Sequence, residues 1–228
     1  MGFALARFYV FNGPTMNRII LIDGENLNRA IRNLAGSVES PVPRDRLDGF
    51  NYKKLIDDVL GDKTKAQIFF FGARLRKYDF DEEILAQSTE SIRLQAKLVN
   101  NLQKQGISFI KLGYLRAREG KPCQKCGHSK WNLTEKGVDV GLAVRMVTEA
   151  GPNTEIVLFS ADTDLLPAVK TAVKLGSRVI FVGYEYQPAL ALSKVATITR
   201  LITAPIVKKY LNTEVVDDPS TSSGPDGK

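Results

Sequence analysis

The sequence predicts an α/β fold in which a parallel sheet lies between two layers of helices. Short apolar runs alternate along the chain with amphipathic segments of helical length. The runs are rich in β-branched residues and end in turn-forming residues, which is typical of strands buried on both faces. The chain has 228 residues, of which 43% are apolar and 25% charged, a balance that suits one soluble domain of this kind.

Five strands are expected, at residues 18–22, 66–71, 107–112, 155–159 and 177–182. The first run ends in Asp23-Gly24 and the second in Gly72, so each strand is followed by a turn. A further apolar stretch at residues 198–202 completes the domain.

Helices are expected at residues 26–34, 52–60, 81–105, 138–150 and 164–175, with a short one at 188–194. The longest has Gly106 as its stop signal. Its apolar residues recur at near-helical spacing and are expected to face the core, although the same face is compatible with a homodimer: Ile84, Leu85, Ile92, Leu98, Val99 and Leu102.

One domain is expected over residues 17–203, between an N-terminal extension (1–16) and a C-terminal tail (204–228). The tail is polar and rich in Pro, Ser and Gly, so we expect disorder from about Thr213. Residues 113–135 break the alternation and carry both cysteines. We expect them to form an inserted loop or small subdomain and not an element of the core.

Charge and cysteine content narrow the class of partner. The formal net charge of +7 favours a polyanion such as nucleic acid. No apolar run approaches the ~20 residues that cross a bilayer, so no membrane association is expected. Two cysteines in 228 residues do not make a disulfide framework, which favours a reducing cytoplasm.

Four aspartates fall where a parallel sheet places its ligands. Asp23 follows the first strand, Asp162 and Asp164 follow the fourth, and Asp139 lies in the first turn of the preceding helix. If the strand order is 3-2-1-4-5, as we expect, strands one and four are neighbours and these carboxylates converge at the carboxyl edge of the sheet. Oxygen-only ligands suit Mg²⁺ or Mn²⁺, which would also neutralise the carboxylates. Taken singly, each aspartate is more often a helix cap or turn former.

Three motifs in this order resemble the NYN domain, a branch of the PIN-like nucleases that includes LabA-like bacterial proteins. The resemblance covers about residues 17–203. The motifs are Ile20-Leu21-Ile22-Asp23-Gly24-Glu25-Asn26-Leu27-Asn28, Lys136-Gly137-Val138-Asp139 and Ser160-Ala161-Asp162-Thr163-Asp164-Leu165-Leu166-Pro167.

The resemblance implies a three-layer PIN-like (Rossmann-like) sheet and metal-dependent RNA cleavage. The implied metal ligands are Asp23, Asp139, Asp162 and Asp164, and Asn26 would orient water or a phosphate. Lys136 and Ser160 would contact phosphate or support the ligands. Hydrolysis by a water that the ion activates would leave a 5′-phosphate and a 3′-hydroxyl.

We therefore expect an endoribonuclease whose partner is RNA, most readily single-stranded. Basic residues after the second strand and in residues 113–135 are the expected phosphate contacts: Arg74, Arg76, Lys77, Arg116 and Arg118. The alternatives are a non-catalytic RNA-binding or regulatory module and a phosphatase acting on small phosphate esters. A haloacid-dehalogenase-type phosphatase would carry Asp-x-Asp at the first strand, where this chain has Glu25 at the second position.

Cys123, Cys126 and His128 supply three ligands with zinc-knuckle spacing. A structural Zn²⁺ site needs a fourth ligand, for which Glu119, Glu135, water or a second subunit are candidates. A redox dithiol and an unmetallated loop are the alternatives.

Overall fold

A computed structural model describes residues 16–63, 65–122, 124–127 and 129–211. Within these residues, seven strands form one sheet in the order β4-β3-β2-β1-β5-β6-β7. The strands are β1 (Asn17–Asp23), β2 (Gln67–Arg74), β3 (Ser108–Glu119), β4 (Trp131–Lys136), β5 (Thr154–Phe159), β6 (Arg178–Tyr184) and β7 (Ile198–Ile202). Every pairing is parallel except the one between β3 and β4.

The predicted α/β class with a mostly parallel sheet is confirmed. The five predicted strands correspond to β1, β2, β3, β5 and β6, and the apolar stretch at the end of the domain forms β7. In the sheet β1 lies between β2 and β5. The carboxyl ends of β1 and β5 are therefore neighbours.

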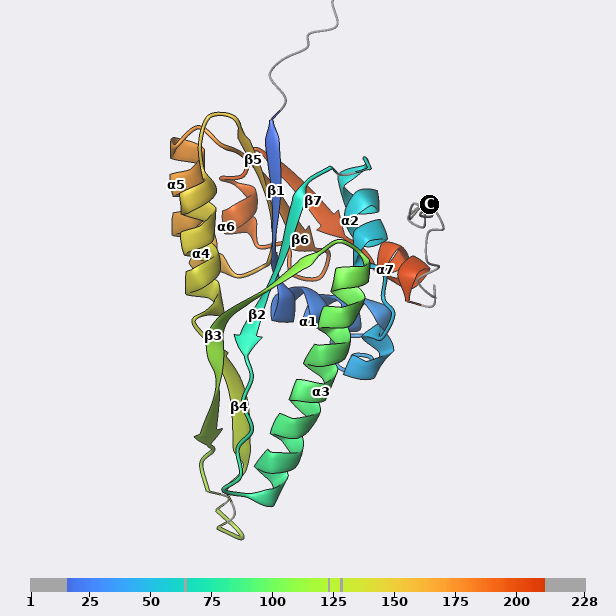
Figure 1. Cartoon of the computed structure of the whole chain (residues 1–228), viewed down its shortest axis with the longest axis vertical. Coiled ribbons are helices and arrows are strands. Elements are labelled where there is room, and N and C mark those ends of the chain that lie inside the picture. Colours follow the sequence, from blue (N-terminus) through green and yellow to red (C-terminus); the bar gives the residue numbers. More distant parts are fainter. Residues whose placement is uncertain (1–15, 64, 123, 128, 212–228) are drawn as a thin grey trace, which may run out of the picture.

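Helices cover both faces of the sheet (Figure 1). They are α1 (Gly24–Ala35), α2 (Tyr52–Leu60), α3 (Glu82–Lys104), α4 (Val138–Glu149), α5 (Leu166–Lys174), α6 (Leu190–Ser193) and α7 (Ala204–Tyr210), with 3-10 turns η1 (Arg44–Leu47) and η2 (Thr163–Leu165).

Alternation along the strands divides the apolar side chains between two cores. Ile20 and Ile22 of β1 pack with α1, α2 and α7, whereas Ile19 and Leu21 pack with α4 and α5. Neighbouring strands follow the same rule, because successive side chains of a strand point to opposite faces. A fully buried Ile or Leu contributes about 1.5–3 kcal/mol, so the central strands form the most strongly fixed part of the fold.

Residues 113–135 do not form the inserted loop that the sequence predicts. β3 continues to Glu119 and pairs with β4, from Tyr114 opposite Lys136 to Glu119 opposite Trp131. The physical reason is a period-two pattern: Leu115 and Ala117 pack toward the apolar residues of one face, while the intervening arginines are exposed. We call residues 113–136 the arm; it projects beyond the rest of the sheet beside α3 (Figure 1).

A small apolar cluster joins the arm to the start of α3. Tyr78 and Ile84 are buried against Leu115. The hydroxyl of Tyr78 donates to the carbonyl of Leu115 at 2.6 Å and accepts from the backbone N–H of Ala117 at 3.2 Å. The arm is therefore a packed extension of the sheet over the residues that the structure describes.

The predicted C-terminal tail begins with a helix that the sequence reading missed. In α7, Val207 and Tyr210 are buried, and the Tyr210 hydroxyl donates to Asp58 of α2 at 2.7 Å. The extension before Met16 and the tail after Leu211, including the part expected to be disordered, lie outside the described residues. Among the helices that are described, none combines the length and apolarity needed to cross a membrane.

Candidate active site

The carboxyl ends of β1 and β5 form the base of the candidate site. Asp23 is the last residue of β1 and the N-cap of α1: its Oδ1 accepts the backbone N–H of Asn26 at 3.2 Å. Its Oδ2 accepts from the hydroxyl of Ser160, just beyond β5, at 3.2 Å. Both oxygens of Asp23 are thus held, one by its own helix and one by the neighbouring strand.

Asn26 and Ser160 connect the two strand ends. The side-chain oxygen of Asn26 accepts the backbone N–H of Ala161 at 3.0 Å. The Ser160 hydroxyl oxygen accepts the backbone N–H of Asp162 at 3.1 Å. Through these bonds the first motif fixes the turn that carries Asp162.

Gly24 is required by the close approach of α1 to β2. A Cβ at this position would lie 2.2 Å from the Phe70 ring and 2.4 Å from the carbonyl oxygen of Phe71. The helix therefore starts directly against the sheet only because residue 24 has no side chain. This packing brings the first turn of α1 to the edge of the site.

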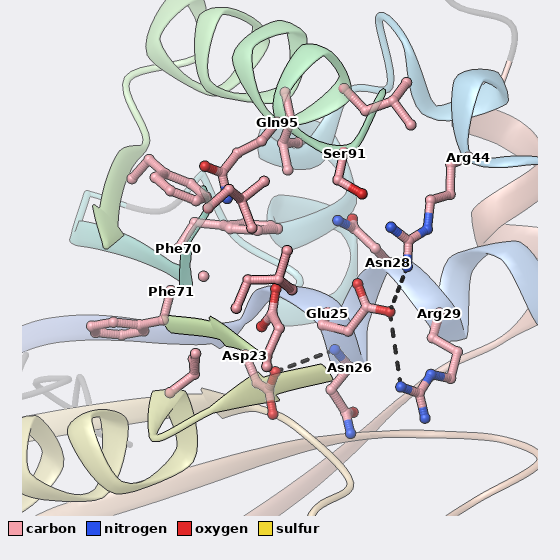
Figure 2. Close-up of a pocket in the computed structure, with 18 of the residues that line it drawn as sticks. Asp23, Glu25, Asn26, Asn28, Arg29, Arg44, Phe70, Phe71, Ser91 and Gln95 are labelled. Atoms are coloured by element: carbon pink, nitrogen blue, oxygen red, sulfur yellow. Dashed lines mark hydrogen bonds and ion pairs between the residues drawn. The ribbon is translucent and has the colours of Figure 1, made fainter. Parts of the chain in front are cut away.

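A cleft of about 800 Å³ opens above this edge, between α1, α3, η1 and the arm. Figure 2 shows Asp23 and Asn26 on one side, Ser91 and Gln95 of α3 opposite, and Glu25 between Asp23 and two arginines. We call Asp23, Glu135, Asp139 and Asp162 the acidic wall, and Arg29, Arg32 and Arg44 the basic wall. Apolar side chains line the part of the cleft toward α3 and the arm, including Leu75, Leu98, Phe109, Leu115 and Leu133.

Two carboxyl groups of the acidic wall have raised pKa values. The pKa of Asp23 is raised to about 6, mainly by burial and also by the nearby charges of Asp162 and Glu25, against the hydrogen bonds from Asn26 and Ser160. Burial also raises the pKa of Glu135 to about 7, with contributions from Glu25 and Asp23, although the backbone amide of Ala73 opposes the shift. Burial is the largest cause in both cases, so the charged forms of Asp23 and Glu135 are disfavoured unless a cation lies beside them.

The donors of the acidic wall fit a hard divalent cation, because they are all carboxylate oxygens and a cation would favour the charged forms of Asp23 and Glu135. Within the described ranges, no group of three or more Asp, Glu, Cys or His side chains is already gathered around one point. Mg²⁺ is commonly held by one or two carboxylates, with water and substrate phosphates completing its shell. Asp23 and Asp162 fit that mode of binding, since the Ser160 hydroxyl bonds both the side chain of Asp23 and the backbone N–H of Asp162.

The predicted site residues divide into two groups in space. Five line the cleft, and Ser160 is buried beneath them: Asp23, Asn26, Lys136, Asp139 and Asp162. Asp164 is exposed and does not line the cleft; its backbone N–H donates to Oδ1 of Asp162 at 2.9 Å, so its main chain supports the turn. Five of the predicted phosphate contacts are exposed and also lie outside the cleft lining: Arg74, Arg76, Lys77, Arg116 and Arg118.

Of the three proposed zinc ligands, the structure describes one. Cys126 is exposed at the tip of the arm, between β3 and β4. Cys123 and His128 lie outside the described residues. The carboxylate of Glu135, one candidate for the fourth ligand, lines the cleft instead.

Several residues of the cleft were not assigned to it from the sequence. Glu25, Arg29 and Arg32 recur at helical spacing after Asp23, a signal that the sequence contained. Arg44 comes from the loop between α1 and α2, and no local pattern indicates where that loop returns. Glu135 enters through β4, which the sequence reading had placed in an insertion.

The chain belongs to the NYN domain family, whose model matches residues 18–203. This family is a branch of the PIN-like nucleases, so the class of protein is nuclease-like. No curated protein matched the sequence.

One solved structure shares the fold. A Vibrio parahaemolyticus protein of unknown function matches with a TM-score of 0.52 and 16% identity, covering 83% of this chain and 95% of its own. A mutant of phosphofructokinase-2 from Escherichia coli has a TM-score of 0.30 at 12% identity, covering 77% of this chain and 53% of its own.

Proposed function

We propose that the protein is a metal-dependent endoribonuclease that hydrolyses single-stranded RNA in the cleft between the acidic and basic walls. The observation that carries the proposal is the pair of strand-end carboxylates, Asp23 and Asp162, joined through Ser160. Membership of a nuclease-like family supports the same reaction class.

The side chains of the site would divide the work. Asp23 and Asp162 would hold Mg²⁺ or Mn²⁺, with Asp139 and Glu135 adding negative charge around it. When bound, the ion would supply Lewis acidity toward the phosphodiester and lower the pKa of a water. Asn26 and Ser160 hold the carboxylates in place by the hydrogen bonds described above. Lys136, the last residue of β4, would contact a phosphate oxygen.

The test is cleavage of end-labelled single-stranded RNA in Mg²⁺, Mn²⁺ or EDTA by the wild type and Asp23→Asn. Asparagine is as good an N-cap as aspartate, so the variant keeps the start of α1. Asp81→Asn is a matched control, because Asp81 caps α3 in the same way, accepting the N–H of Ile84 at 3.1 Å, but does not line the cleft.

We expect cleavage that requires the ion, disappears in Asp23→Asn and persists in Asp81→Asn. RNA binding without cleavage by the wild type in either ion would instead identify a non-catalytic RNA-binding module. Absence of both binding and cleavage would direct attention to a small phosphate ester. Equal cleavage by wild type and Asp23→Asn would show that Asp23 does not take part.

A further inference from the structure

The basic wall combines one face of α1 with the returning loop. Glu25, Arg29 and Arg32 follow one another at helical spacing, so their side chains project from one face of the helix. Arg44, the first residue of η1, reaches the same face from the loop. All four residues line the cleft.

Arg29 and Arg44 converge on one oxygen atom. Oε1 of Glu25 lies 3.8 Å from Nη2 of Arg29 and 3.2 Å from Nη2 of Arg44, as Figure 2 shows. These two distances bring the two Nη2 atoms within 7.0 Å of each other. A phosphate group can bridge such a span by accepting a charge-assisted hydrogen bond of about 2.8 Å from each guanidinium.

Arg32 fixes the position of the loop that carries Arg44. Its Nε donates to the carbonyl of Val42 at 2.5 Å, and the N–H of Val42 donates back to the carbonyl of Arg32 at 3.2 Å. These bonds fasten the loop that carries Arg44 onto α1. Burial lowers the pKa of Arg32, and the positive charges of Arg44 and Arg29 lower it further. Arg29 and Arg44 therefore share the carboxylate of Glu25, and Arg32 adds a third positive charge beside them.

The accessible members of the wall are the two that converge. The side chains of Arg29 and Arg44 are 65% and 53% exposed, so both can exchange their contact with Glu25 for a ligand from solvent. Surface ion pairs of this kind are worth only about 0–1 kcal/mol, so the exchange costs little. Arg29 lies six residues beyond Asp23, roughly 9 Å along the helix axis. Glu25 lies between Asp23 and the two arginines, so a phosphate at the arginines would be a neighbour of the one beside Asp23 (Figure 2).

We propose that Arg29 and Arg44, positioned by Arg32, form a phosphate-binding subsite for a second phosphate of the nucleic-acid strand. The proposal deepens the proposed function, since it concerns how the same cleft holds its substrate. The ligand is either an internal phosphodiester or the phosphate at a 5′ end. The subsite differs from the basic residues that the sequence suggested: Arg29 and Arg44 were not among them, and of those residues only Lys136 lines the cleft.

The test measures RNA binding alone, so its result does not depend on whether the protein cleaves RNA. The anisotropy of a 3′-fluorescein-labelled single-stranded oligouridylate is followed in EDTA at several KCl concentrations. Wild type is compared with the double variant Arg29→Gln/Arg44→Gln and the charge-preserving Arg29→Lys/Arg44→Lys. Arg178→Gln/Arg200→Gln is the matched control, because it also removes two exposed arginines, and neither of those lines the cleft.

We expect Arg29→Gln/Arg44→Gln to bind at least about 5-fold more weakly and to reduce the slope of log K against log salt by about 1.4, or about 0.7 for each lost contact with a single strand. The lysine variant should retain the slope and the control should match the wild type. Equal loss in the glutamine variant and the control, or no loss in either, would overturn the subsite.

Two 5′-variants of the probe identify the source of the phosphate. The subsite is assigned to a terminal phosphate if the wild type binds a 5′-phosphorylated oligomer more tightly than a 5′-hydroxyl oligomer and the glutamine variant binds the two oligomers with equal affinity. Equal binding of both oligomers by the wild type, together with the loss in the glutamine variant, assigns it to an internal phosphate. If the nuclease test fails while this binding defect is found, the subsite stands without the reaction.

Discussion

The two walls of the cleft are held by different parts of the fold. The acidic wall begins at the ends of β1 and β5, where the strands beneath it are fully buried and both oxygens of Asp23 are bonded. The basic wall comes from a helix surface and a loop, and its two converging arginines are more than half exposed. The acidic side chains are therefore held rigidly, whereas the side chains of Arg29 and Arg44 are free to move.

This difference matches the demands of two tasks. Chemistry at a phosphodiester needs groups fixed in advance, because reorganising them during the reaction would cost free energy. Contact with a polyanion tolerates movement, because guanidinium groups on long side chains can follow a flexible strand. We therefore expect changes in the acidic wall to alter turnover and stability, and changes in the basic wall to alter binding.

The largest effect is expected at Asp162, with Asp164 as its matched partner two residues away. Asp162 lines the cleft whereas Asp164 is exposed outside it. Asp162→Asn should lower kcat/KM by at least about 100-fold, since even groups that only support a metal ligand are worth about 10- to 100-fold. Asp164→Asn keeps the backbone N–H that bonds Asp162 and should have an effect several-fold or smaller. Equal losses would show that Asp164 reaches the reaction centre and that the division of the motif is wrong.

The next effect concerns the bridge between the strands. Asn26→Ala removes the acceptor of the Ala161 N–H. An unsatisfied buried donor costs about 1–3 kcal/mol, which urea unfolding of the variant would measure. The turn that carries Asp162 also loses its tie to α1, so kcat should fall while RNA affinity in EDTA changes little. Unchanged stability with reduced kcat would instead mean that Asn26 contacts the substrate directly.

The sequence was sufficient for the central fold but not for the cleft. Strands such as 155–159 and helices such as 52–60 are strongly patterned, and the structure has them as β5 and α2 with bounds within a residue. The prediction for the arm was wrong because its charged residues and cysteines obscured the alternation of Leu115, Ala117 and Leu133. Short local patterns reveal which residues are buried, but not that a strand will turn back against its neighbour.

The site shows the same limit. Motif order placed Asp23, Asp139 and Asp162 on one edge, because strand ends follow from the fold class. Arg44 and Glu135 reach the cleft through a loop return and a hairpin, which are long-range contacts without a local signature. Of the basic residues chosen from the sequence, Lys136 lines the cleft, whereas the five arginine and lysine residues at or after the end of β2 and in β3 do not.

The pH dependence of stability tests how much the ionised form of Asp23 destabilises the folded protein. The pKa of Asp23 is about 6 in the folded protein, against about 3.9 for an unperturbed aspartate, so the folded state holds its proton more tightly. The free energy of unfolding therefore falls as the pH rises from about 4 to 6, and the penalty is complete above that range. Asp23→Asn should be nearly as stable as wild type at pH 4 and more stable by about 1–3 kcal/mol at pH 8 in EDTA.

Urea unfolding at both pH values, with the exposed Asp164→Asn as control, measures this difference. Addition of Mn²⁺ at pH 8 should stabilise the wild type and remove the advantage of Asp23→Asn, because a cation relieves the same repulsion. A wild type that becomes more stable between pH 4 and 8 relative to Asp23→Asn would show that the carboxylate is already compensated in the folded protein.

The smallest effect is expected at Arg32, which belongs to the basic wall but acts through the loop. Arg32→Ala removes the bond to the Val42 carbonyl and should cost about 1 kcal/mol of stability. The loop of residues 36–43 should then exchange its amide hydrogens faster, while β1 and β5 keep their protection. Hydrogen exchange read by mass spectrometry separates the two regions. Faster exchange in β1 as well would mean that the walls are one cooperative unit, and the contrast between a rigid acidic wall and an adaptable basic wall would fail.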